Sequence, residues 1–207
     1  MVPNRLTMSV AIVSACLAVV TPASGQSLEQ ALASITKSAR KNQTVEAVVP
    51  EPAVLLARLQ QQGRALLVLE RTQRVLSRTG DPIWDLRLEI PGQPARHFDA
   101  VSGRAGRQNA NRHRLGSRAP LPAGQYTLGP VESLADGAYP ELGPVWIGIE
   151  PTFPTGRRVL GIHQDPSAGR NANSGTLGCI GLIHRHELLE LAQQIRQASI
   201  RELVVAH

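Results

Sequence analysis

Residues 161–179 read GIHQDPSAGRNANSGTLGC, and the rest of the chain can be interpreted as a frame that holds this stretch. His163 stands near its beginning and Cys179 at its end, and the residues between them are mostly Gly, Ser, Asn, Asp and Pro, which favour a loop. The apolar run over 159–162 predicts a strand that ends at His163, and the run over 180–183 predicts a short apolar segment leading into a helix. A loop between these two segments can fold back so that the imidazole and the thiol meet.

The chain has two cysteines, and we expect only Cys179 to remain in the mature protein. Residues 1–25 have the order of a secretory signal: Arg5, an apolar core that contains Cys16, and then small residues. The apolar core is shorter than the roughly 20 residues that a membrane span needs, so we expect export and no stable membrane insertion after cleavage. A lipoprotein cleavage box at Val13–Cys16 is the alternative, which is disfavoured because the apolar core continues past Cys16.

A lone thiol in an exported protein has no intramolecular disulfide partner and is a candidate reactive group. The competing interpretation is a buried cysteine that serves as a small hydrophobic residue. Gly178 precedes the thiol, so backbone N–H groups beside Cys179 could reach a developing oxyanion without obstruction from a side chain. This favours the reactive interpretation.

Residues 26–63 predict a short N-terminal helical preface. One helix is expected to start at Ser27, and a second to run from about Pro52 to a stop at Gly63. Neither helix carries residues that suggest chemistry. We expect them to cover one face of a sheet or to tether the domain.

Residues 64–207 predict one main domain built from short strands that are separated by turn residues. One clear amphipathic helix is expected over 184–198. The pattern therefore predicts a mainly β domain, a sandwich or barrel-like body, with a C-terminal helix. Trp146 is expected to pack in its core, because the chain has only 3% aromatic residues to fill one. The expected strands cover 65–70, 74–78, 84–90, 97–101, 144–149, 159–163 and 202–206.

The chain is basic, with a formal net charge of +6, and arginines are concentrated between residues 104 and 118. Nucleic-acid binding is disfavoured, because few aromatic residues are available to stack on bases and because the protein is expected to be exported. A solvated loop is the simplest interpretation of this segment. An arginine-rich rim that attracts an anionic polymer is the alternative. The arginines concerned are Arg104, Arg107, Arg112, Arg114 and Arg118.

The residues around the thiol resemble the L,D-transpeptidase catalytic domain family (YkuD-like), over roughly residues 64–206. That family has a His, a loop of similar length and a Ser/Thr-x-Gly-Cys segment, matched here by His163 and by Thr176–Cys179. It also has a Ser/Thr-x-Gly strand end, where this chain has the similar segment Val101-Ser102-Gly103, and a Pro-x-Gly-x-aromatic turn, matched by Pro122–Tyr126. This chain departs from the family at two positions. Leu177 stands where many members have a second His, and Gly181 where they usually have Arg.

The resemblance implies cysteine-dependent acyl transfer on peptidoglycan stem peptides, through a thioester and without a cofactor. Cys179 would be the nucleophile, paired as a thiolate with the imidazolium of His163, which later serves as the acid. The backbone carbonyl of Gln164 is implied to hold the ring, with Asp165 as an alternative, and the N–H groups of Gly178 and Cys179 are the expected oxyanion donors. Substrate contacts are expected from a second set of residues, which comprises Arg157, Arg158, Arg170, Ser174 and Thr176.

Three other functions remain open. Water could replace the amine acceptor, which would make the protein an L,D-carboxypeptidase or endopeptidase. A non-catalytic cell-wall-binding module with an inert Cys179 belongs to a different class. A metal site ranks last, because Cys179 with His163, His184 and His186 has no standard zinc spacing. In each case the expected location is the periplasm or the cell wall.

Overall fold

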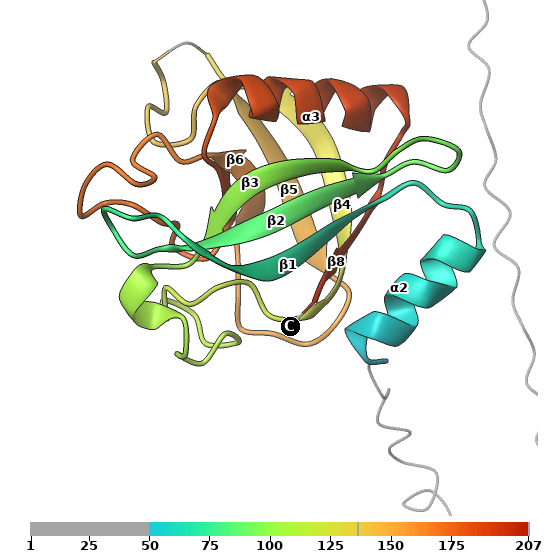
Figure 1. Ribbon diagram of the computed structural model, residues 1–207, viewed down its shortest axis with the longest axis horizontal. Coiled ribbons are helices and arrows are strands. Elements are labelled where there is room, and N and C mark those ends of the chain that lie inside the picture. The colour runs from blue at the N-terminus through green and yellow to red at the C-terminus, as the bar shows by residue number, and fades with distance from the viewer. Residues whose placement is uncertain (1–49, 136, 207) are drawn as a thin grey trace, which may run out of the picture. The chain divides into compact units, whose positions relative to one another are not determined.

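Eight strands close into a barrel in the computed structural model, which describes residues 50–135 and 137–206 (Figure 1). The strands are β1 (Leu66–Val75), β2 (Pro82–Glu89), β3 (Arg96–Ser102), β4 (Gly124–Ser133), β5 (Val145–Pro151), β6 (Leu160–Gln164), β7 (Ile180–Leu182) and β8 (Glu202–Val205). The helices are α2 (Pro52–Gln61), the short 3-10 helix η1 (Ala105–Arg107) and α3 (Arg185–Gln197). The mainly β prediction is confirmed. The expected export signal over 1–25 and the helix expected from Ser27 lie outside the described residues.

The order of strands around the barrel is β1-β2-β3-β7-β6-β5-β4-β8. Most neighbours are antiparallel, but β6 pairs in parallel with β7, and β1 in parallel with β8. Parallel strands need a crossover connection. Between β6 and β7 this crossover is the Gly- and Ser-rich loop over 165–179, so the site predicted from sequence lies at the point where these two strands meet.

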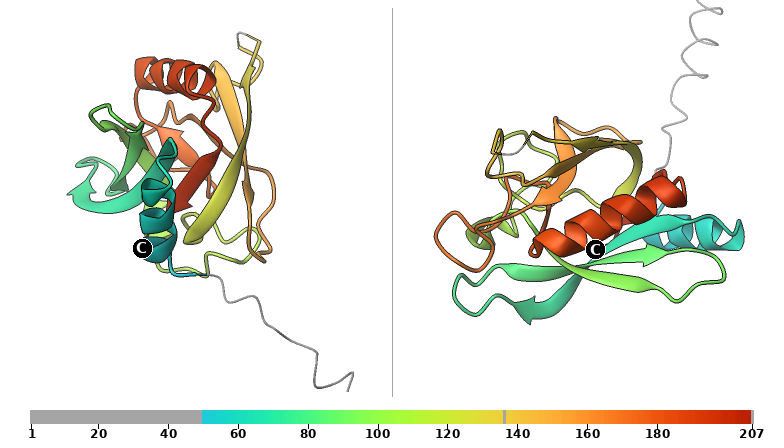
Figure 2. Two further views of the ribbon diagram at one scale, coloured as in Figure 1. Left: turned by 90° about the vertical axis from the view of Figure 1, so that its right-hand side faces the viewer. Right: turned by 90° about the horizontal axis from the view of Figure 1, so that it is seen from above.

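The first four residues of β1, Leu66–Leu69, are buried on both faces, which explains their unbroken apolar run. Leu67 and Leu69 point into the barrel, while Leu66 and Val68 pack outside with Leu59 of α2. The left view of Figure 2 shows α2 on the outside of the barrel beside β8. The second helix of the expected preface therefore covers a sheet face. A separate strand at 74–78 was a wrong prediction, because β1 itself continues to Val75 and then turns.

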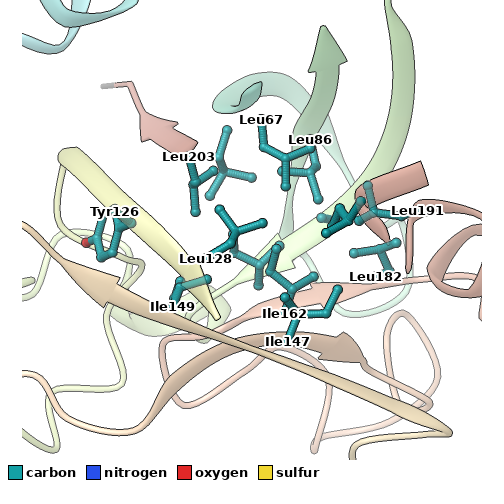
Figure 3. Packing of buried hydrophobic residues seen from close by; sticks show 14 of the residues in the cluster. Leu67, Leu86, Tyr126, Leu128, Ile147, Ile149, Ile162, Leu182, Leu191 and Leu203 are labelled. Atoms are coloured by element: carbon teal, nitrogen blue, oxygen red, sulfur yellow. The ribbon is translucent and has the colours of Figure 1, made fainter. Parts of the chain in front are cut away.

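The core fills the barrel with aliphatic side chains from alternate strand positions (Figure 3). From Trp84 onward the buried positions of β2 are Trp84, Leu86 and Leu88, as the period of two predicts. Helix α3 lies along the upper side of the barrel in Figure 1, and Leu188 and Leu191 join the same core. Each such leucine contributes about 1.5–3 kcal/mol when it is removed from water. Among the described residues no helix combines the length and the apolar character that a membrane crossing requires.

Candidate active site

The parallel pairing of β6 with β7 brings His163 and Cys179 to one face of the barrel wall. The register aligns Ile162 with Ile180 and His163 with Gly181, and Cys179 immediately precedes β7. Because side chains alternate along a strand, the imidazole and the thiol point to the same side as diagonal neighbours. Both line one cavity of about 680 Å³. The loop therefore brings the two groups to the same cavity, as predicted.

The imidazole of His163 is held by its own strand. Its Nδ1–H donates to the carbonyl oxygen of Gln164 at 2.5 Å, as the family resemblance implied. Since a carbonyl can only accept, Nδ1 carries the hydrogen and Nε2 is the basic nitrogen of the neutral ring. Asp165, the alternative partner for the ring, was a wrong prediction. Its Oδ1 accepts from the N–H and hydroxyl of Ser167, and its Oδ2 accepts from the N–H of Gly175, so it holds the loop.

Trp146 lies in this site, although a place in the core was expected. Its indole stacks on the His163 ring, with 5.8 Å between centroids and 19° between planes, and it lines the cavity. The cause is strand alternation: Ile147 pairs with Ile162 and faces the core, so Trp146 must face the opposite side beside His163. A Cβ at Gly161 would overlap the indole ring, so this residue leaves the space that Trp146 occupies.

A single hydroxyl organises the segment before Cys179. Oγ1 of Thr176 accepts from the N–H groups of Gly103 and Gly178 at 3.0 and 3.1 Å, and donates to the carbonyl of Cys179 at 2.8 Å. A hydroxyl has one hydrogen to donate and two lone pairs to accept, so these three bonds use the full hydrogen-bonding capacity of the Thr176 hydroxyl. Thr176 is therefore a positioning residue. It lines the cavity of Cys179, where a substrate residue was expected, but its hydroxyl has no hydrogen-bonding capacity left for a substrate.

The same bonds revise the expected oxyanion donors. The N–H of Gly178 is already donated to Thr176, so its predicted role toward an oxyanion was wrong for this conformation. The N–H of Cys179 has no acceptor among the described residues and remains available. One backbone donor beside the sulfur is thus free to meet a developing negative charge.

Arg157 supports the Cys179 segment from behind and is only 4% exposed. Its Nη2 donates to the carbonyl of Leu177 at 3.1 Å, and its Nη1 donates to the carbonyls of Arg112 and Ala119 at 3.2 and 3.3 Å. Gly178 has φ +119°, and a Cβ there would overlap Nη2 of Arg157, so the guanidinium needs this glycine. The prediction that Arg157 recognises substrate was wrong, because its donors are bound to backbone carbonyls.

The other predicted substrate contacts lie outside the cavity of Cys179. Arg158 is exposed and donates to the carbonyls of Thr155 and Arg157, within its own loop. Arg170 and Ser174 line a neighbouring cavity instead. The cation that does line the cavity of Cys179 is Arg104. Sequence reasoning placed this residue in the basic segment but did not connect it with the thiol.

Burial keeps both reactive groups neutral. It raises the pKa of the Cys179 thiol, and an N–H of Gly161 and the charge of Arg157 oppose this only in part. It also lowers the pKa of His163, against the opposing effects of the Gln164 carbonyl and Asp165. Both directions disfavour the thiolate–imidazolium pair that was expected, so the resting pair is a thiol and a neutral imidazole. The sulfur contacts the carbonyl of Val159 at 3.9 Å, a weak hydrogen bond.

Val159 is strained at the edge of the cavity. Its φ of +51° lies in the left-handed region, which is a rare conformation for a β-branched residue, and its side chain is 85% exposed. The strand was predicted to include Val159 but begins at Leu160, because this backbone turn cannot join the ladder. Strained residues of this kind cluster at functional sites.

Comparisons with known proteins add little to this geometry. The chain matches no known family and no curated protein. Among solved structures, the structure of Bdellovibrio bacteriovorus Bd1075 is similar, with a TM-score of 0.40 and 13% sequence identity. The alignment covers 69% of this chain and 47% of that one, so this chain matches about half of that protein's length. Among the described residues, no group of three His, Cys, Asp or Glu side chains could hold a metal ion.

Proposed function

We propose that this protein is a cysteine acyltransferase of the L,D-transpeptidase (YkuD-like) type, which acts on peptidoglycan stem peptides outside the cytoplasm. The observation that carries the proposal is the shared cavity of Cys179 and His163, with Nδ1 of the ring held by Gln164 and Nε2 left basic. A thiol, a base and an element that orients the base are the parts that nucleophilic catalysis requires.

The neutral resting pair determines how the reaction starts. As the sulfur of Cys179 attacks the peptide carbonyl, Nε2 of His163 takes the thiol proton, so the thiolate forms only during attack. The carbonyl oxygen becomes negative and accepts from the N–H of Cys179. The C–N bond then breaks, His163 returns its proton to the leaving amine, and the acyl group remains on sulfur as a thioester.

The second half of the reaction is the reverse, with a new nucleophile. The amine of another stem peptide attacks the thioester carbonyl while His163 accepts its proton. The C–S bond breaks, the sulfur takes the proton back, and a new amide is released. Trp146 and Leu142 give the cavity an apolar wall beside the thioester. We propose that this wall disfavours water and so favours the amine as acceptor.

The experiment mixes the purified protein with stem peptides released from cell walls and follows the protein by intact mass. We expect a covalent adduct equal to the donor peptide minus its leaving amino acid. This adduct should be absent in Cys179→Ala and should form much more slowly in His163→Gln. Arg158→Ala is the matched control, because this arginine is exposed next to the site and should leave the rate unchanged. A Cys179 thiol that is never acylated by stem peptides or by a carbapenem would refute the proposal.

A further inference from the structure

A second cavity, of about 430 Å³, adjoins the first. Arg104 lines both cavities, so the second begins where the cavity of Cys179 ends. Three segments form its walls: the turn between β1 and β2, the residues after β3, and the loop between β6 and β7. Each segment contributes one arginine, and these are Arg78, Arg104 and Arg170.

These three arginines differ from several of those on the barrel wall. Arg74 pairs with the carboxylate of Asp99, and Arg87 pairs with those of Glu70 and Glu89. Within residues 50–135 and 137–206, Arg78, Arg104 and Arg170 form no such ion pair. Their charges are therefore available to a ligand.

The one carboxylate in the lining, that of Asp81, accepts a hydrogen bond from the backbone. Its Oδ1 accepts from the N–H of Ala105 at 3.0 Å. Three arginines minus one aspartate leave a formal charge of +2 in the cavity. Arg104 is fixed there, because its Nη1 donates to the carbonyl of Ser174 at 2.8 Å. Arg78 and Arg170 are exposed, so they can turn toward a bound anion.

We infer that this cavity binds a carboxylate of the substrate at a distance from the reacting carbonyl, which makes acidic peptides with a free carboxylate the preferred substrate class. The inference rests on the proposed function for its substrate. Its physical basis is that planar guanidinium groups donate paired hydrogen bonds to carboxylates. Such a subsite would supply the cationic recognition that Gly181 cannot provide. A Cβ at Gly181 would lie 2.8 Å from Cγ2 of Thr176, so there is no room at this position for the side chain of an arginine.

The test measures binding in the Cys179→Ala protein, which removes chemistry from the readout. The probes are a stem peptide with free carboxylates and the same peptide with those carboxylates amidated, titrated by calorimetry. We expect Arg78→Gln/Arg170→Gln to weaken binding of the free-acid peptide about tenfold, a value discounted for the exposure of both side chains. The amidated peptide should bind the parent and the double variant equally weakly.

The matched control is Arg58→Gln/Arg114→Gln, which removes the same charge from two exposed arginines outside this cavity. It should weaken binding less than twofold. Equal losses in the two double variants would show a general charge effect and would overturn the inference, as would tight binding of the amidated peptide. If no thioester ever forms but binding keeps its dependence on Arg78 and Arg170, the proposed catalysis fails while the anion subsite stands.

Discussion

Replacing Arg157 with alanine is expected to loosen the segment that carries Cys179 and to raise the pKa of its thiol further. The buried guanidinium supplies hydrogen bonds to three backbone carbonyls, those of Arg112, Ala119 and Leu177. Each hydrogen bond from a charged donor contributes about 1.5–3 kcal/mol, and water that enters the vacated space recovers part of the loss. The net cost should be about 3–5 kcal/mol in the free energy of unfolding.

Two measurements check this prediction. Urea unfolding gives the stability, and the rate of iodoacetamide alkylation against pH gives the thiol pKa. In Arg157→Ala the alkylation inflection should move to higher pH, because the positive charge of Arg157 lowers the pKa of Cys179. Arg157→Lys keeps that charge but not the planar fork, so it should lose stability while its inflection stays near that of the parent.

Arg158→Ala is the control, since this neighbouring arginine is exposed and bonds only within its own loop. It should change stability by less than about 0.5 kcal/mol. If Arg157→Ala unfolds at the same urea concentration as Arg158→Ala, with an unchanged alkylation profile, Arg157 does not support the segment. A loss confined to KM would instead restore its expected role in substrate recognition.

Three further predictions concern stability. Thr176→Val removes the acceptor of two buried N–H groups and should lower the free energy of unfolding, measured in urea, by about 2–4 kcal/mol. The control Thr127→Val, at an exposed position, should leave that free energy almost unchanged. Equal effects of the two substitutions would contradict the role of the Thr176 hydroxyl. Because burial lowers the pKa of His163, the unfolded chain binds a proton at this residue more readily than the folded protein does. The protein should therefore have its full stability above pH 6.5, the ordinary pKa of histidine, and should lose at most about 1.4 kcal/mol per pH unit below it. His163→Gln should lack this part of the slope between pH 7.5 and 5, and an unchanged slope would show that another group causes it. Val159→Asn should raise the unfolding free energy by about 1 kcal/mol, because Asn tolerates the left-handed backbone, and a lower melting temperature would argue against strain there.

Local patterns predicted most of the strands, but not how they pair. The alternation of Trp84, Leu86 and Leu88 follows from the pleat of a strand with one buried face. The barrel order depends on contacts such as Leu66 with Glu202, which leave no trace in either segment alone. Local patterns therefore do not distinguish a sandwich from a barrel, and the pairing of β1 with β8 and of β6 with β7 decides for the barrel.

The site was predictable where residue type decides chemistry and unpredictable where packing decides it. The thiol and the imidazole follow from their types and from the resemblance. Alternation with Ile147 places Trp146 in the site, whereas the scarcity of aromatic residues favours a place in the core, and the alternation prevails. Arg157 and Arg158 are identical in type and adjacent, so nothing local reveals that only the first is buried. Arg157 can be buried because Gly178 has no side chain, and the guanidinium occupies the space where a Cβ would lie.

The position of β8 between β1 and β4 has a consequence for how the protein is made. Closing the barrel requires Leu66 to find Glu202, which lies 136 residues away along the chain (202 minus 66). Such distant pairing slows folding. A nascent chain therefore presents two unpaired strand edges, a template for aggregation, until its last strand arrives. Yield in expression should depend on chaperones that cover these edges more than on the strength of the finished core.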